Sequence, residues 1–130
     1  MSELLPLTPS TEDYLETIYR LSDLGKTGVR SIDVANQLQV AKPSVNRALR
    51  HLTEGGWITQ EPYALIYLTG SGLNRAEGIF DRHRTLQVFL RDVLGVGEPM
   101  AEEDACKMEH VISEQTMYAL QQFMRTYFAP

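Results

Sequence analysis

Apolar residues recur every three or four positions in three stretches of the first half of the chain, the spacing of helices that bury one face. The three predicted helices cover residues 11–24, 31–39 and 43–54. Their inward positions are Tyr14, Leu15, Ile18 and Leu21, then Ile32, Val34, Ala35 and Leu38, and finally Val45, Leu49 and Leu52. Two short runs at 57–60 and 64–68 predict a β-hairpin after the third helix. Three helices followed by a hairpin are typical of a winged helix-turn-helix.

Local signals mark several helix ends. Thr8 or Ser10 is expected to start the first helix, and Gly25 and Gly28 are expected to end it. Pro43 suits the first turn of the third helix, because that turn needs no hydrogen bond from its N–H group.

The second half of the chain is predicted to be helical throughout. A long helix starts near Thr69 or Ser71 and reaches Leu94, where a Gly-Val-Gly segment and Pro99 interrupt it. Two more helices cover about 101–112 and 113–127. The sequence therefore predicts a mainly α protein, with a winged helix-turn-helix domain over residues 1–70 and a helical domain over residues 71–130.

The distribution of charge matters more than its sum. A net charge of −5 argues at first sight against a nucleic-acid partner. However, no acidic residue occurs between Asp33 and Glu54, a stretch that contains Lys42, Arg47 and Arg50. The acids gather later, at Glu98, Glu102, Glu103, Asp104, Glu109 and Glu114. A basic helix with a remote acidic segment is compatible with a DNA-binding protein that binds cations elsewhere.

The third predicted helix carries the candidate DNA-binding residues. Opposite its apolar edge it presents short polar and basic side chains that can reach base edges and phosphates. These residues are Lys42, Pro43, Ser44, Asn46, Arg47 and Arg50. The alternatives are a solvated basic face or a winged helix that binds protein, since Pro62 and Tyr63 at the hairpin tip bring no positive charge.

A cluster in the second half predicts a metal site. Cys106, Glu109 and His110 are spaced i, i+3 and i+4, so on a helix they share one face, away from the apolar Ala105 and Met108. One helix cannot supply the four to six donors that a divalent ion needs. The further candidates are Asp13, Glu16 and His83. Mixed carboxylate, imidazole and thiolate donors suit Mn²⁺, Fe²⁺, Co²⁺ or Zn²⁺.

Each candidate ligand also has a structural interpretation. Asp13 and Glu16 could stabilise the helix N-terminus, with Glu16 paired to Arg20 one turn later. His83 is in line with apolar positions and could be a core histidine. Cys106 could be a small buried hydrophobe, and Glu109 and His110 could form a solvated surface pair. Spacing alone leaves these alternatives open.

Other features limit the function classes. A chain of 130 residues suits one domain or two small ones, and no apolar run approaches the ~18–20 residues that span a membrane. The N-terminus lacks the pattern of a signal peptide, and a single cysteine fits a reducing compartment. We therefore expect a cytoplasmic protein without a membrane partner. No general-base arrangement or small-molecule substrate site is evident, so an enzyme is not expected.

Several segments together resemble a known family. The run from Thr8 to Tyr19, the helix-turn-helix, Leu68-Thr69 before Gly72, Arg82-His83-Arg84, and Cys106 to His110 occur in this order. The pattern resembles the diphtheria toxin repressor family of metal-dependent transcriptional regulators over nearly the whole chain. The chain ends soon after the last predicted helix, so we expect the SH3-like third domain of the iron-responsive members to be absent. This makes it most similar to the two-domain manganese transport regulators.

The resemblance implies a homodimer that binds a palindromic operator and, with metal bound, represses metal-uptake genes. The second domain would then be a metal-binding and dimerisation domain. The residues that match metal ligands of the manganese branch are Asp13, Glu16, His83, Glu109 and His110. Cys106 departs from that branch, which commonly has glutamate there, and Asp13 departs from the iron branch, which has methionine. Gln87 and Glu102 stand where the iron branch places the ligands of a second site. Manganese is favoured, with iron next.

Two hypotheses complete the sequence-based picture. Metal binding would link the first helix to the long and fifth helices and so set the spacing of two recognition helices in a dimer. The dimer surface is predicted at Phe89, Val93, Tyr118 and Phe123, although these residues could be ordinary core. The alternative function is a thiol-based redox regulator in which Cys106 responds to oxidant without metal.

Overall fold

The computed structural model describes residues 7–62 and 64–130, and the chain divides into two compact units, Met1–Gly78 and Ile79–Pro130. The expectation about a signal peptide and the prediction for Tyr63 fall outside the described residues. Each unit is defined by the contacts within it, which places the division after Gly78. The predicted boundary between the functional domains, at residue 70, stays a prediction. Within the described residues, no helix is both long enough and apolar enough to cross a lipid bilayer.

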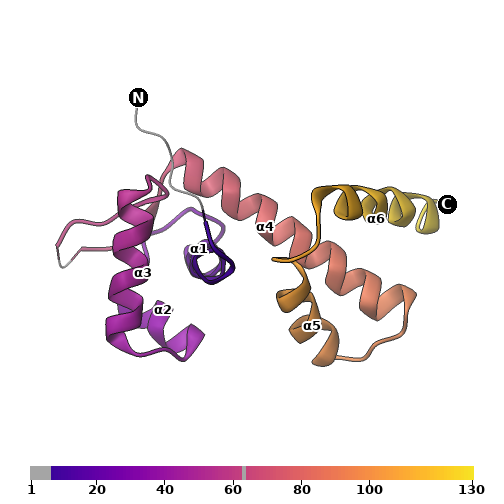
Figure 1. Ribbon diagram of the computed structural model, residues 1–130, viewed down its shortest axis with the longest axis horizontal. Helices are drawn as coiled ribbons and strands as arrows, with labels where there is room; N and C mark the ends of the chain where they lie inside the picture. Colours follow the sequence, from indigo (N-terminus) through magenta and orange to yellow (C-terminus); the bar gives the residue numbers. More distant parts are fainter. Residues whose placement is uncertain (1–6, 63) are drawn as a thin grey trace. The chain divides into compact units, whose positions relative to one another are not determined.

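The first unit is a winged helix-turn-helix, as the sequence predicts (Figure 1). It comprises α1 (Pro9–Leu21), α2 (Ser31–Leu38), α3 (Lys42–Glu54), the strands β1 (Ile58–Thr59) and β2 (Tyr67–Leu68), and the first turns of α4 (Gly70–Val88). Helix α1 packs against α2 and α3, and α3 packs against β1. The strands pair antiparallel, with Ile58 opposite Leu68.

Helix α1 starts at Pro9 and ends at Leu21, so both ends come earlier than the predicted range 11–24, although Thr8 was one of the two predicted start signals. Thr8 is the N-cap and forms a capping box with Thr11, which satisfies N–H groups that the helix itself leaves unpaired. The helix ends at Leu21 because Asp23 and Leu24 adopt left-handed backbone, with φ of 51° and 60°. Every residue of 14–19 is buried, including Glu16, which the apolar pattern places on the polar side.

The helix-turn-helix follows the predicted apolar edge in α3 and only partly in α2, where Ala35 and Leu38 are half-buried. Val34 and the three predicted inward residues of α3 are buried. A left-handed Gln39, with φ of 54°, makes the turn between α2 and α3. Ile32, predicted to point inward, is 54% exposed, because it lies in the first turn of α2, where the polar face meets solvent.

The wing is attached to the start of α4 through hydrogen bonds of the Thr69 side chain with backbone groups. Thr69 Oγ1 donates to the carbonyls of Gly56 and Trp57, at 2.7 and 3.0 Å, and accepts the N–H of Gly72. The two strands are shorter than predicted, but Val29 adds an isolated bridge to Ile66. The bridge arises from the tertiary fold, so the local pattern did not reveal it.

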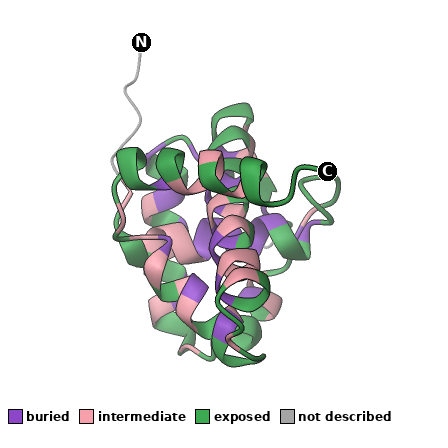
Figure 2. Cartoon of the chain, turned by 90° about the vertical axis from the view of Figure 1, so that its right-hand side faces the viewer, coloured by how far each residue is buried: buried purple, intermediate pink, exposed green. Residues whose placement is uncertain are grey.

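The second unit contains the end of α4, η1 (Phe89–Val93), α5 (Met100–Met108) and α6 (Glu114–Tyr127). Its core is formed by Leu86, Leu90, Ala101, Ala105 and Met117 (buried residues are purple in Figure 2). The predicted long helix changes to a π-helical turn over its last residues, where the N–H of Leu94 donates to the carbonyl of Phe89. Helix α5 ends at Met108 instead of Ile112, so Glu109 caps it and His110 lies in the following turn.

Candidate metal centre

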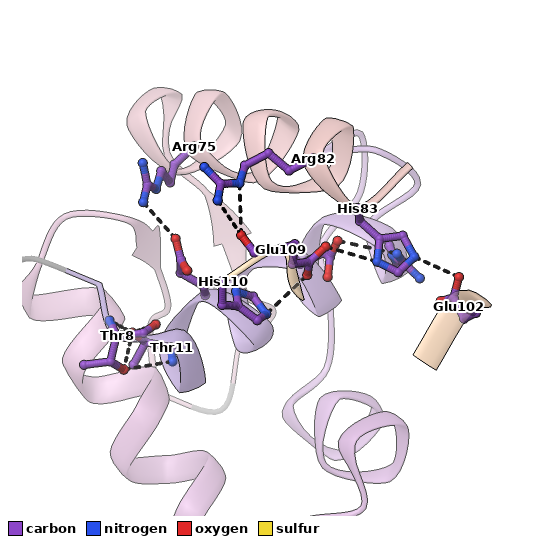
Figure 3. A network of polar contacts seen from close by, with 11 residues as sticks. Thr8, Thr11, Arg75, Arg82, His83, Glu102, Glu109 and His110 are labelled. Carbon is purple, nitrogen blue, oxygen red and sulfur yellow. Dashed lines mark hydrogen bonds and ion pairs between the residues drawn. The ribbon is translucent and has the colours of Figure 1, made fainter. Parts of the chain in front are cut away.

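His83 lies on α4 with a carboxylate at each ring nitrogen. Its Nε2 is 2.8 Å from Glu102 Oε2 and its Nδ1 is 3.0 Å from Glu109 Oε2 (Figure 3). The histidine and Glu109 are each 2% exposed, whereas the Glu102 side chain is 40% exposed. His83 is therefore buried, as the structural interpretation of a core histidine expects. However, both of its ring nitrogens face carboxylates.

The other three predicted donors of this unit converge beside that pair. One ligand atom each of Cys106, Glu109 and His110 lies within 4.8 Å of the others. His110 Nε2 is 3.2 Å from Glu109 Oε1, so Glu109 faces an imidazole with each oxygen. Cys106 is half-buried on α5. The i, i+3, i+4 spacing thus brings the side chains together even though α5 ends before the last two residues.

The polar atoms at the centre are not satisfied by hydrogen bonds. His83 Nδ1 and both carboxylate oxygens of Glu109 are buried and lack a hydrogen-bond partner among the described residues. The distances to their neighbours are those of ion pairs, but the directions are not those of hydrogen bonds. Buried polar atoms without partners are costly. Aligned imidazole, carboxylate and thiolate donors around such atoms fit a divalent cation.

The two carboxylates also change the proton affinity of His83. Burial lowers the pKa of the imidazole, while the two close carboxylates of Glu109 and Glu102 raise it. The acidic neighbours prevail, and the pKa of His83 lies above its ordinary value. When His83 is protonated, its positive charge balances that of Glu109.

The remaining predicted ligands, Asp13 and Glu16, lie on α1 in the first unit. They are spaced i, i+3, so they occupy one face of the helix. Glu16 is buried and accepts from Arg20 at 3.4 Å, which confirms the predicted ion pair one turn later. A carboxylate has about four acceptor positions, so an ion pair with Arg20 is compatible with a metal ion on the same carboxylate.

The predicted DNA-binding residues occupy the solvent side of α3. All are exposed except Ser44, which is half-buried. An open groove runs between α2, α3 and the wing, and Arg30, Lys42, Asn46 and Tyr67 contribute to its walls. Gln60 in the wing donates to Ser31 at 3.0 Å, which links the wing to the start of α2.

The predicted dimerisation residues lie on η1 and α6 of the second unit. Tyr118 and Phe123 are 64% and 48% exposed, while Phe89 and Val93 are half-buried. The rings of Phe89 and Phe123 meet edge to face, with centroids 6.3 Å apart. The core interpretation is thus incorrect for the two α6 residues within the single chain.

Two polar residues at this centre make contacts that the sequence pattern did not predict. Glu102 holds Nε2 of His83, and Arg82 donates to backbone carbonyls at the end of α5. The sequence placed an arginine directly before the histidine, but spacing does not reveal a contact between a side chain and a distant carbonyl.

Comparison with known proteins agrees with this arrangement. The profile of the iron-dependent repressor N-terminal DNA-binding domain matches residues 6–65, and that of the iron-dependent repressor metal-binding and dimerisation domain matches residues 69–127. The transcriptional regulator MntR of Escherichia coli is 35% identical over 119 residues, which are 91% of this chain and 75% of that protein. The diphtheria toxin repressor of Corynebacterium diphtheriae is 28% identical over 109 residues, or 84% of this chain and 48% of the repressor.

A solved structure has the same fold. The manganese regulator SloR superposes with a TM-score of 0.79 at 28% identity, over 92% of this chain and 55% of that one. The chain therefore spans about half the length of SloR and of the diphtheria toxin repressor.

The chain belongs to the iron-dependent repressor family, which includes the diphtheria toxin repressor. The predicted resemblance is confirmed, as is the predicted architecture of a DNA-binding domain followed by a metal-binding and dimerisation domain. Members of the family are metal-dependent transcriptional regulators and not enzymes, which agrees with the predicted class of function.

Proposed function

We propose that this protein is a repressor that requires Mn²⁺ in preference to Fe²⁺ and that binds a palindromic operator as a homodimer. The proposed ligands in the second unit are His83, Cys106, Glu109 and His110. The observation that supports this most directly is the buried Glu109 carboxylate, which two imidazoles flank without hydrogen bonds. Bound there, a divalent ion would supply the positive charge that this carboxylate otherwise takes from protonated histidine.

The donor set supports the choice of metal. Asp13 and Glu16 of the first unit complete the proposed ligand set, a step that rests on the sequence. Three carboxylates and two imidazoles favour a hard or borderline ion such as Mn²⁺, whereas the Cys106 thiolate favours a softer one. Iron is therefore the second candidate.

Each residue of the second unit has a distinct role in this proposal. In this proposal the Nε2–H of His83 donates a hydrogen bond to Glu102, which fixes the tautomer whose Nδ1 lone pair is directed at the centre. Glu109 and His110 bring their donor atoms from the turn after α5, and Cys106 brings its sulfur from the last turn of α5.

The DNA-binding role falls to the exposed side of α3. Asn46, Arg47 and Arg50 can reach base edges, while Lys42 and Ser44 lie at the helix start, near the phosphates. In a twofold dimer the two α3 helices must lie about one DNA turn apart, roughly 34 Å, to read a palindrome. Phe89, Val93, Tyr118 and Phe123 are proposed to form the surface between protomers.

The proposed switch uses the packing of the first unit. Helix α1 contacts both α2 and α3, so a metal ion bound by residues of α1 is connected mechanically to α3, the proposed DNA-recognition helix. Ligand binding at ~100 times its dissociation constant contributes about 2.7 kcal/mol per site to the preferred state. Two sites in a dimer would shift operator affinity by orders of magnitude if only one state binds the ion well. A cytoplasmic location is part of this proposal, since the operator is chromosomal.

The test selects an operator and then varies the metal. A pool of labelled duplexes with a randomised palindromic centre is enriched on the protein with Mn²⁺ present. Fluorescence anisotropy then gives the Kd of the selected duplex with Mn²⁺, with Fe²⁺ under anaerobic conditions, with Zn²⁺ and with chelator. We expect affinity at least about 100-fold higher with Mn²⁺ than with chelator. Equal affinity in all four conditions would contradict the proposal.

A further inference from the structure

The turn that carries two of the proposed ligands follows the end of α5, where backbone carbonyls lose their helical partners. Helix α5 ends at Met108, so the carbonyls of its last turn have no partners further along the helix. Glu109 and His110 follow directly after that turn. The amides of Val111 and Ile112 both donate to the carbonyl of Met108, at 3.1 and 3.3 Å, which closes a tight turn.

Arg82 on α4 supports this segment from a different helix. Its Nε and Nη2 donate to the carbonyl oxygen of Glu109, at 3.0 and 2.6 Å (Figure 3). Nη2 also donates to the carbonyl of Ile112, at 2.8 Å. The side chain is half-buried. One planar guanidinium thus holds both ends of the segment 109–112, whose side chains include two proposed ligands.

We propose that Arg82 is a positioning residue that fixes the turn 109–112 and so orients Glu109 and His110 for the metal. This inference rests on the proposed function. Arg82 immediately precedes His83 on α4, so the same helical turn provides one ligand and the support for two others. The rigid fork of arginine suits this role, because lysine can place a single ammonium near one carbonyl but cannot hold both with fixed geometry.

The experiment compares the full-length Arg82→Lys and Arg82→Gln variants with the wild type. Arg84→Lys is the matched control, since Arg84 is exposed on the same helix and lies over the ring of Phe80. Three quantities are measured: the Kd for Mn²⁺ from the EPR signal of free Mn²⁺, the absorption spectrum of bound Co²⁺, and amide hydrogen exchange of Val111 and Ile112 in the metal-free protein. Circular dichroism and Tm report folding.

We expect the Kd for Mn²⁺ to rise about tenfold or more in both Arg82 variants, as for other residues that orient metal ligands. The Co²⁺ spectrum should change, because it reports ligand geometry, and amides 111 and 112 should exchange faster before any metal is added. The Arg84→Lys variant should match the wild type in all three measurements. A residue that only stabilised the fold would lower the Tm and leave the Co²⁺ spectrum and the Kd of the folded protein unchanged.

The contrary outcomes are distinguishable. If the wild type binds Mn²⁺ and both Arg82 variants bind it equally well with an unaltered Co²⁺ spectrum, the positioning role is overturned and the proposed function stands. If the wild type itself binds neither Mn²⁺ nor Co²⁺, both are overturned. If neither variant folds, Arg82 is a structural residue and the positioning role is rejected.

Discussion

The Nδ1 atom of His83 lies 3.0 Å from Oε2 of Glu109, and both residues are only 2% exposed to solvent. A buried carboxylate needs a positive partner, because an uncompensated charge in the interior is strongly unfavourable. The partner is the protonated histidine or a metal ion, and the two compete for the same atoms. This competition makes the centre sensitive to pH as well as to metal.

The first prediction concerns pH and the metal-free protein. A raised pKa in the folded state means that protonation of His83 stabilises the fold. The contribution is complete below the unfolded-state pKa of ~6.5 and is lost as the pH rises through the higher folded-state value. Urea unfolding of the wild type and of His83→Gln should therefore differ more at pH 6 than at pH 9. A difference that grows with pH would contradict this sign. The His51→Gln variant serves as the control, since His51 lies on α3 in the other unit.

The same protonation opposes metal binding. Because a ligand must lose its proton before it coordinates, the apparent affinity for Mn²⁺ should rise with pH until His83 is deprotonated without metal. Calorimetric titration in buffers with different ionisation enthalpies should show protons released per ion near neutral pH, because both a protonated His83 and the Cys106 thiol must lose a proton to coordinate. In His83→Gln the number of protons released should be smaller than in the wild type. An unchanged number of protons in that variant would assign the effect to other groups.

The role of Glu109 gives a second site-specific prediction. Glu109→Gln keeps the shape of the side chain and removes its charge, so the Kd for Mn²⁺ should rise by more than the ~10–100-fold typical of residues that only support a ligand. Glu114→Gln, at an exposed position in the first turn of α6, should bind Mn²⁺ as the wild type does. Equilibrium dialysis with metal analysis measures both. An unchanged Kd for Glu109→Gln would exclude the buried carboxylate as a ligand.

Cys106 separates the proposed mechanism from the redox alternative. Cys106→Asp retains an anionic donor but cannot undergo thiol oxidation, so metal-dependent DNA binding should persist, with selectivity shifted toward Mn²⁺ over softer ions. Cys106→Ala lacks the donor and should bind Mn²⁺ more weakly. DNA binding of the wild type that responds to peroxide in the presence of chelator, and that is lost in Cys106→Asp, would support redox sensing instead.

The positions of the helices and the buried edge of α3 could be predicted from the sequence, because both depend on local periodicity. Val45, Leu49 and Leu52 repeat at helical spacing, and each is buried where that spacing requires. Helix ends were less accurate. The two left-handed residues after α1 and the short α5 reflect turns whose geometry depends on contacts with distant segments. Ile32 shows that an apolar residue in a first turn need not face the core.

The donor residues of the candidate site could be predicted from the sequence, but the residues that hold those donors in place could not. Cys106, Glu109 and His110 carry chemistry that a pattern of residue types can reveal. The contact of Glu102 with His83 and the contacts of Arg82 with two carbonyls join residues 19 to 30 positions apart. Such contacts depend on how α4 and α5 pack, and backbone carbonyls carry no sequence signature.

DNA recognition by α3 gives a prediction independent of the metal ligands. Arg47→Ala should weaken binding to the selected operator by about 1–3 kcal/mol if the guanidinium contacts a base, and it should leave the Kd for Mn²⁺ unchanged. Lys107→Ala, at an exposed position on α5, should bind the operator as the wild type does. Anisotropy titrations at several salt concentrations distinguish base contacts from phosphate contacts, because loss of a phosphate contact reduces the salt dependence. Unchanged operator affinity would remove Arg47 from the DNA surface.

The connection between the wing and α4 is the subject of the last prediction. A Cβ atom on Gly72 would lie 1.9 Å from the carbonyl oxygen of Trp57, so no side chain fits without moving the backbone. Gly72→Ala should therefore destabilise the protein by about 2–3 kcal/mol. Gly78→Ala is the matched control on the same helix, where a Cβ atom has nothing within 4 Å, and it should stabilise the protein by up to ~1 kcal/mol. Urea unfolding measures both free energies. Two variants of equal stability would show that the start of α4 does not press on the wing, and that the hydrogen bonds of Thr69 alone hold the two together.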